Sequence, residues 1–198
     1  MVLGPQGAGK GTQAKRISLE YGIPHVSTGD MFRAEQAAGT DFGKRVGEIM
    51  ESGELVPDEL TVAMIQDRLS RPDAGEGFVL DGFPRNLAQA EALDGMLSSI
   101  GRGLDAILFF DVPDEVGVER ALKRAELENR ADDTPEVLAK RLETYHRETE
   151  PIVEHYRTTG KLVPLHAGRT VEEVWREIAE SLQQAEVGVG STEPSRQR

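Results

Sequence analysis

Short apolar runs alternate along the chain with longer amphipathic stretches. The five runs with strand character are Val2-Leu3 and residues 24–27, 78–81, 106–111 and 161–165. The run Ala106-Ile107-Leu108-Phe109-Phe110 is apolar at successive positions, as expected for a parallel strand that is buried on both faces. The alternation therefore predicts an α/β fold, with a five-stranded parallel sheet flanked by helices.

Capping signals indicate where the later helices begin. Asp114 can cap a helix that continues to about Leu127, and Pro135 stands at a first helical position. The segment Thr170-Val171-Glu172-Glu173 has the spacing of a capping box before the last helix.

Two segments interrupt the alternation of strands and helices. Residues 28–66 are helical without a strand, and residues 125–133 form a short charged link. We expect both to be mobile elements inserted into a single domain over residues 1–186. Residues 187–198 are rich in Gly, Ser, Pro and charge, and we expect them to form a disordered tail.

The composition limits the classes of partner. The 198 residues carry a formal net charge of −12, so the overall field repels nucleic acid and anionic membranes. The chain has no cysteine, which excludes disulfides and thiolate metal sites. The first five residues do not have the pattern of a signal peptide, and no apolar run approaches transmembrane length. We therefore expect a cytoplasmic protein, whose site for any anionic ligand concentrates Lys and Arg locally.

A glycine-rich segment joins the first predicted strand to a helical pattern. It reads Gly4-Pro5-Gln6-Gly7-Ala8-Gly9-Lys10-Gly11-Thr12. Glycines let successive backbone N–H groups point at phosphate oxygens, and the helix N-terminus and a lysine add positive charge. The placement between strand and helix is that of a P-loop. Gly11 stands where most P-loop enzymes have a magnesium-binding hydroxyl, and Thr12 follows it. The candidates for binding the donor phosphates are Gly7, Ala8, Gly9, Lys10, Gly11 and Thr12.

From Gly4 to about Ile178 the sequence resembles the adenylate kinases. Four blocks carry the resemblance: residues 7–12, Ser27-Thr28-Gly29-Asp30-Met31-Phe32-Arg33, Asp81-Gly82-Phe83-Pro84-Arg85 and Arg130-Ala131-Asp132-Asp133. The resemblance implies a P-loop kinase fold with a helical AMP-binding insertion at about residues 27–56 and a short lid at about residues 124–134. It also implies the reversible, magnesium-dependent reaction ATP + AMP = 2 ADP, adenine nucleotide homeostasis as the role, and a monomer.

The resemblance assigns an acceptor site. Thr28 would contact the AMP base or ribose, and Arg33 the phosphate. Arg85 and Gln89 are four residues apart, so on a helix they share a face, where Arg85 could hold the phosphate and the amide of Gln89 the adenine edge. The implied AMP-binding set is Thr28, Arg33, Glu54, Leu55, Val56, Gly82, Phe83, Pro84, Arg85, Gln89, Arg130 and Arg141.

Asp81 ends a predicted buried strand, at the edge of the sheet where ligand sites of open parallel sheets lie. Its position alone also suits a turn-former. By resemblance, Asp81 would organise Mg²⁺, largely through water.

A set of arginines can supply the local positive charge that an anionic ligand requires. Arg120 and Arg124 share a face of one predicted helix, Arg130 follows the link, and Arg141 lies on the next helix. By resemblance, Arg120 stacks near the ATP adenine, Arg124 contacts the ATP phosphates, and Arg130 and Arg141 bridge the two nucleotides. Arg169 is a further candidate for the ATP site. The catalytic candidates are Lys10, Asp81, Arg124, Arg130 and Arg141.

The lid departs from many bacterial members of the family. Only residues 125–129 separate Arg124 from Arg130, which leaves neither room nor a cysteine for a structural zinc. Glu126 and Glu128 bring negative charge close to the expected phosphates. Four histidines, His25, His146, His155 and His166, have no catalytic spacing, and we expect them to be structural or solvated.

Three alternatives share part of the pattern. A UMP/CMP kinase would have the same fold, but pyrimidine-specific relatives tend to have Ala and Asn in place of Thr28 and Gln89. A nucleotide-dependent switch protein has no need of a second phosphate site. A P-loop kinase for a small metabolite such as shikimate would lack the block that runs from Asp81 to Arg85.

Overall fold

The computed structural model describes residues 1–128 and 133–189. Five strands form one sheet in the order β2-β3-β1-β4-β5, and every pairing is parallel, which confirms the predicted sheet. After β3 the chain crosses β1 to build the other half of the sheet, so the carboxyl end of β1 lies at the point where ligands bind in such folds. The strands are β1 (Val2–Leu3), β2 (His25–Ser27), β3 (Val79–Asp81), β4 (Ile107–Asp111) and β5 (Leu162–His166).

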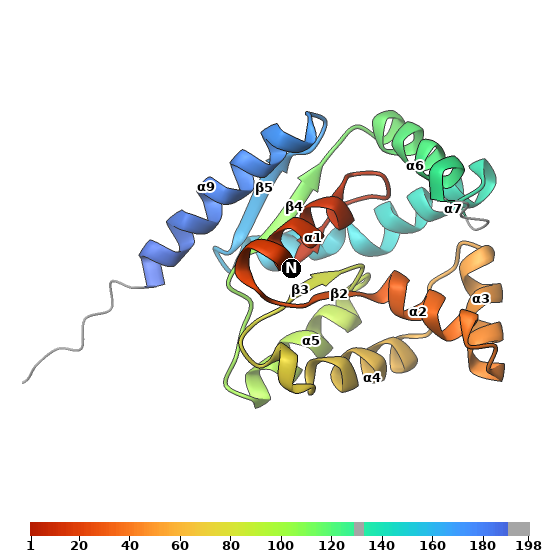
Figure 1. Ribbon diagram of the computed structural model, residues 1–198, viewed down its shortest axis with the longest axis horizontal. Helices are drawn as coiled ribbons and strands as arrows, with labels where there is room; N and C mark the ends of the chain where they lie inside the picture. Colours follow the sequence, from red (N-terminus) through yellow and green to blue (C-terminus); the bar gives the residue numbers. More distant parts are fainter. Residues whose placement is uncertain (129–132, 190–198) are drawn as a thin grey trace, which may run out of the picture.

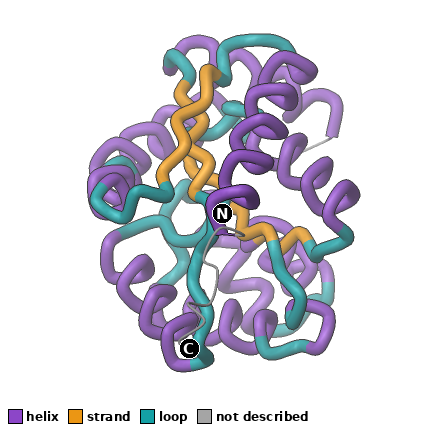
Figure 2. The backbone as a smooth tube through the Cα atoms, turned by 90° about the vertical axis from the view of Figure 1, so that its left-hand side faces the viewer, coloured by secondary structure: helices purple, strands orange, loops and turns teal. Residues whose placement is uncertain are grey.

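Helices cover both faces of the sheet (Figures 1 and 2). Helices α1 and α9 contribute to the core on one face, and α4, α5 and α8 to the core on the other. The helices on the two faces are α1 (Lys10–Tyr21), α4 (Asp58–Leu69), α5 (Leu87–Ser99), α8 (Pro151–Arg157) and α9 (Val171–Val189), with a short 3₁₀ turn η1 (Pro72–Ala74) after α4.

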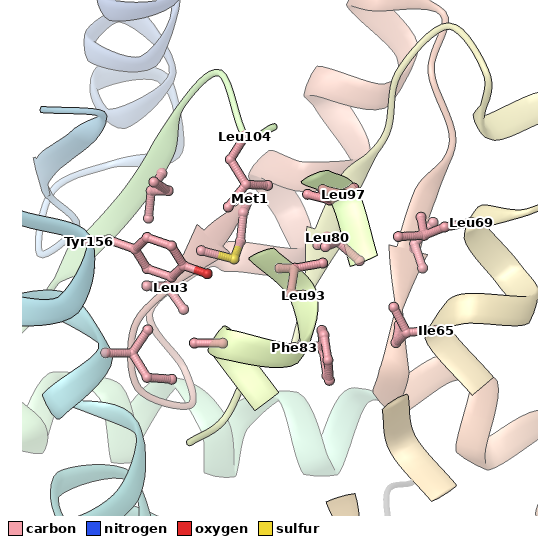
Figure 3. Packing of buried hydrophobic residues seen from close by; sticks show 14 of the residues in the cluster. Met1, Leu3, Ile65, Leu69, Leu80, Phe83, Leu93, Leu97, Leu104 and Tyr156 are labelled. Carbon is pink, nitrogen blue, oxygen red and sulfur yellow. The ribbon is translucent and has the colours of Figure 1, made fainter. Parts of the chain in front are cut away.

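Neighbouring residues of the strands point to opposite cores. In β3, Val79 packs with the α1 side and Leu80 with the α5 side, and both are buried. Figure 3 shows Leu80 among Phe83, Leu93 and Leu97 in this second core. This two-sided burial explains why the strands read as continuous apolar runs and not as alternating ones.

Two helical arms extend from the sheet. In Figure 1 they lie on the right, with α6 (Asp114–Glu128) and α7 (Pro135–Thr144) above and α2 (Thr28–Ala37) and α3 (Asp41–Glu51) below. The lower arm has a small core of its own, made by Phe32, Val46 and Val56. A π-helical segment η2 (Tyr145–Thr149) joins α7 to α8.

Two expected boundaries need correction. Helix α6 continues to Glu128, so residues 125–128 of the expected charged link are helical, and residues 129–132 of that link lie outside the described residues. Helix α9 continues to Val189, three residues into the expected tail, because neither Val187 nor Gly188 stops a helix as proline does. The rest of the tail, residues 190–198, is likewise not described. Within residues 1–128 and 133–189, no helix is long and apolar enough to cross a membrane.

We predict that Leu93→Ala on α5 lowers the free energy of unfolding by about 2–5 kcal/mol, because its fully buried side chain (0% exposed) leaves a cavity. Leu19→Ala on α1 is the matched control: Leu19 is 85% exposed, so its effect should stay within about 0.5 kcal/mol. Denaturant unfolding of both variants measures the difference, and similar losses would contradict this core.

Candidate active site

A cavity of about 740 Å³ lies at the carboxyl ends of β1, β2 and β3. Residues of the P-loop, of both arms and of the loop before α9 line it. All predicted site residues line this cavity except two. Phe83 is fully buried in the core on the α5 side, so its side chain does not reach the expected AMP site. Arg130 lies outside the described residues.

The P-loop needs glycine at Gly7. Its φ is +73°, and a Cβ atom there would lie 1.8 Å from the carbonyl oxygen of Gly117. Gly7 therefore lets the loop pack directly on α6 while the loop curls around the N-terminus of α1. Helix α1 begins at Lys10, so its free N–H groups face the cavity edge where an anion would bind.

The side chain of Lys10 folds back onto the P-loop. Its Nζ atom donates to the carbonyl of Pro5 at 2.6 Å. Burial lowers the pKa of Lys10 from its ordinary value to about 8, and the attraction of Asp81 is countered by Arg85 and Arg124. A bound phosphate group would add negative charge beside Lys10 and so favour the protonated amine.

Asp81 ends β3 and faces both Lys10 and His25. Its Oδ2 atom lies 3.1 Å from His25 Nε2. Burial tends to raise the pKa of Asp81, but the hydrogen bond from His25 and the charge of Lys10 outweigh it and lower the pKa below the ordinary value. We expected His25 to be only structural or solvated. No sequence signal placed it there: the contact depends on the register of β2 beside β3, where Ser27 pairs with Asp81 and His25 with Val79.

The residues around Asp81 fit a magnesium ion that arrives with its substrate. Among the described residues, no group of three or more His, Asp or Glu side chains could hold a metal on its own. Mg²⁺ is usually bound by one or two carboxylates, waters and substrate phosphates, so a single carboxylate beside a phosphate loop suits it. Asp81, which lines the cavity, is a carboxylate in such a position.

The residues of the expected acceptor site gather around the carbonyl of Gly82. Thr28 Oγ1 donates to it at 2.9 Å, and Arg85 Nε donates to it at 2.9 Å. Gly82 has a φ of +78°, and a Cβ atom there would lie 2.6 Å from Thr28 Oγ1, so only glycine allows this approach. Burial and the nearby charge of Arg141 both lower the pKa of Arg85.

Arg85 and Gln89 are in contact, but they do not lie on one helix face as the spacing predicts. Asn86 caps α5, which begins at Leu87, so Arg85 precedes the helix. The backbone N–H of Arg85 donates to Gln89 Oε1 at 2.8 Å, and Gln89 Nε2 donates to Asp58 at 2.7 Å. Asp58 also accepts from Asn86 Nδ2, and no sequence signal marked it as part of the site.

The lower arm adds a second arginine and an apolar wall. Arg33 pairs with Asp30 at 2.5 Å and lines the cavity. Leu55 and Val56 line it too, whereas the carboxylate of Glu54 reaches Lys140 of α7 at 3.0 Å.

The upper arm holds two arginines on one carboxylate. Asp133, whose side chain is 0% exposed, accepts from Arg124 at 2.5 Å and from Arg141 at 2.6 Å. Arg141 also donates to the carbonyl of Met50. Asp133 thereby fixes the spacing of the two guanidinium groups, one from α6 and one from α7. Glu128 lines the same cavity, so negative charge does lie near these arginines, as we expected.

Arg169 belongs to the loop between β5 and α9, and the side chain of Arg120 on α6 reaches the same loop. Arg120 donates to the carbonyls of Ala167, Gly168 and Arg169 at 2.7, 3.1 and 3.1 Å. The guanidinium of Arg169 instead pairs with Glu177 at 2.5 Å. Arg169 is therefore held by Glu177 of α9 and donates through Nε to the carbonyl of His166 at 3.3 Å, whereas Arg120 binds the carbonyls of the loop itself.

The comparisons with known proteins all point to one family. A model of the adenylate kinase family matches residues 2–161. The adenylate kinase of Kosmotoga olearia is 43% identical over 210 residues, covering 92% of this chain and 98% of that protein. Those of Stenotrophomonas maltophilia and Thermosynechococcus vestitus are 47% and 49% identical, covering 88% of this chain and 93% and 91% of their own.

The pKa of Lys10 gives a direct test of the loop geometry. Before an anion binds, its amine loses its proton as the pH rises through about 8, so affinity for inorganic tripolyphosphate should fall between pH 7 and pH 9. NMR of ¹⁵N-lysine protein should show one Nζ titration near pH 8, and Lys10→Met should remove it. A Lys10 midpoint above pH 10 would contradict the buried position.

Proposed function

The chain belongs to the adenylate kinase family, and we propose how its cavity carries out the reaction ATP + AMP = 2 ADP. The protein is a nucleoside monophosphate kinase, a transferase. The observation that supports the assignment of its residues is that one cavity is lined by the P-loop and by a second set of phosphate-binding candidates. We propose that ATP binds at the P-loop while AMP binds at Thr28, Arg85 and Gln89.

The donor phosphates bind at the N-terminus of α1. The backbone N–H groups of residues 7–12 and the amine of Lys10 surround the β- and γ-phosphates. Arg120 faces the donor base, since it lies on the cavity wall beside the loop before α9. Arg169 contributes through its backbone, because its side chain pairs with Glu177.

The acceptor phosphate binds between Arg33 and Arg85. Both line the cavity, and Arg85 is oriented by the carbonyl of Gly82. The acceptor base reaches Gln89, whose amide can donate and accept at once and so matches the N1 and N6 atoms of adenine. To do so, Gln89 exchanges its bonds with Asp58 and the Arg85 backbone for bonds with the base.

Phosphoryl transfer between these sites needs charge stabilisation and no general base. The attacking oxygen of AMP is already an anion. Negative charge spreads over the equatorial oxygens of the transferred group in a loose transition state, and planar guanidinium groups match those oxygens. Arg124 and Arg141, which Asp133 keeps together, face the gap between donor and acceptor. Arg130 is the third member of this set by resemblance.

Magnesium supplies charge neutralisation on the ATP phosphates when it is bound with them. Asp81 would hold it, mainly through water. His25 keeps the carboxylate of Asp81 ionised and oriented toward the cavity.

Closing the arms over the cavity would exclude water, which otherwise competes with AMP for the transferred group. Lid closure of this kind is a general property of adenylate kinases, and the two arms are the elements that would carry it out here. We further propose a monomer that works in the cytoplasm on ATP, AMP and ADP. The resemblance to the adenylate kinases supports the monomer, and the net charge of −12 disfavours nucleic acid and membrane surfaces.

The acceptor assignment predicts the order of substrates. With MgATP as donor, ADP formation should be fastest with AMP and at least about tenfold slower with CMP, UMP or GMP, because one mismatched base contact costs about that factor. A coupled assay over the four monophosphates measures it. If CMP or UMP outran AMP, the protein would be a pyrimidine nucleotide kinase.

The two-site assignment predicts that Arg85→Ala separates the substrates. The KM for AMP should rise about a hundredfold, because the variant loses the buried charge-assisted pair between the guanidinium and the AMP phosphate. The KM for ATP should change less than about twofold. The matched control is Arg71→Ala, because Arg71 is an exposed arginine paired with Asp67 on α4. Steady-state kinetics with each substrate varied measures both values, and an equal rise in the two would refute the assignment.

A further inference from the structure

Gln13 on α1 has a buried side-chain amide whose nitrogen is hydrogen-bonded and whose oxygen is not. The residue is 2% exposed, and its Nε2 atom donates to the carbonyl of Val171 at 2.8 Å. Its Oε1 atom is buried and has no hydrogen-bond partner among the residues that the structure describes. A buried acceptor without a partner costs stability.

The bond to Val171 is not needed to satisfy that carbonyl. Val171 is the first residue of α9, and carbonyls of a first helical turn accept intrahelical bonds in any case. An apolar side chain of similar length, such as methionine, would fill the same space without the unsatisfied oxygen. The amide of Gln13 is therefore less stabilising than an apolar side chain at this position. The role of its bond to Val171 must lie in the two segments that the bond connects.

The bond connects the two halves of the donor site. Gln13 lies one turn into α1, where its backbone N–H donates to the carbonyl of Gly9 at 3.2 Å, and the N-terminus of this helix carries the P-loop. Val171 follows the loop whose carbonyls accept from Arg120. Gly9, Gln13 and Val171 all line the cavity.

We propose that Gln13 is a positioning residue that sets the distance between the P-loop and the loop of residues 167–170, and thereby selects the donor base. The inference rests on the donor site assigned above. Adenine carries an exocyclic amine that can donate to a carbonyl of this loop, whereas guanine has a carbonyl oxygen at the same position of the ring and would meet another acceptor. Such discrimination requires that the loop lie at a fixed distance from the bound phosphates.

Gln13→Met is the main test, with Gln66→Met as the matched control at an exposed position of α4. In Gln13→Met the KM for ATP should rise about tenfold and the preference for ATP over GTP should shrink about tenfold. The KM for AMP and kcat should change less than about twofold, because the acceptor site and the lid arginines are not touched. The thermal midpoint should equal or exceed that of the control, since the variant removes a buried unsatisfied oxygen.

Gln13→Asn provides a second variant. It keeps the amide but is one methylene shorter, so it cannot reach Val171, and it should show the same rise in the KM for ATP and the same loss of donor preference.

Four outcomes would overturn the proposal. They are an unchanged KM for ATP in Gln13→Met, an unchanged preference over GTP, a thermal midpoint well below that of the control, and wild-type donor kinetics in Gln13→Asn. Failure of the proposed function would look different, because the unmodified protein would then form no ADP from ATP and AMP.

Discussion

Two polyanions have to lie within bonding distance of one another inside a chain of net charge −12, and this electrostatic constraint shapes the cavity. Lysine and arginine side chains are gathered there from several elements, and they repel one another when no nucleotide is present. Acceptors hold several of them: the carbonyl of Pro5 holds Lys10, the carbonyl of Gly82 holds Arg85, the loop carbonyls hold Arg120, and Asp133 holds Arg124 and Arg141. These cations are thus positioned before the phosphates bind, which lowers the reorganisation energy of the phosphate-binding groups.

The fold meets this constraint through its topology. A parallel sheet places the carboxyl ends of all its strands at one edge, so the P-loop after β1 and Asp81 at the end of β3 become neighbours although they are far apart in sequence. The two helical arms then bring further arginines to the same edge. The three central strands β1, β3 and β4 pack against both cores, so a displacement of any of them would disturb two cores at once.

Sequence predicted the parts of the molecule that depend on local patterns. The five strands follow from apolar runs, and the P-loop follows from glycine spacing between a strand and a helix. Contacts between elements could not be predicted in the same way. The contacts of His25 with Asp81 and of Gln89 with Asp58 join residues that are far apart in the sequence and share no sequence pattern. The motif around Phe83 predicts a residue of the AMP site, but a motif gives residue types and not the direction of a side chain, and this one lies in the core. The spacing of Arg85 and Gln89 suggested one helix face, but Asn86 starts the helix between them.

Simultaneous occupation of the cavity by both nucleotides is tested most directly by calorimetric titration of AMP into the protein saturated with the non-transferable analogue β,γ-imido-ATP and Mg²⁺. Two separate sites predict that AMP binds at one equivalent, with an affinity equal to or greater than that for the free protein. Competition, in which the analogue abolishes AMP binding in proportion to its own occupancy, would contradict the two-site cavity.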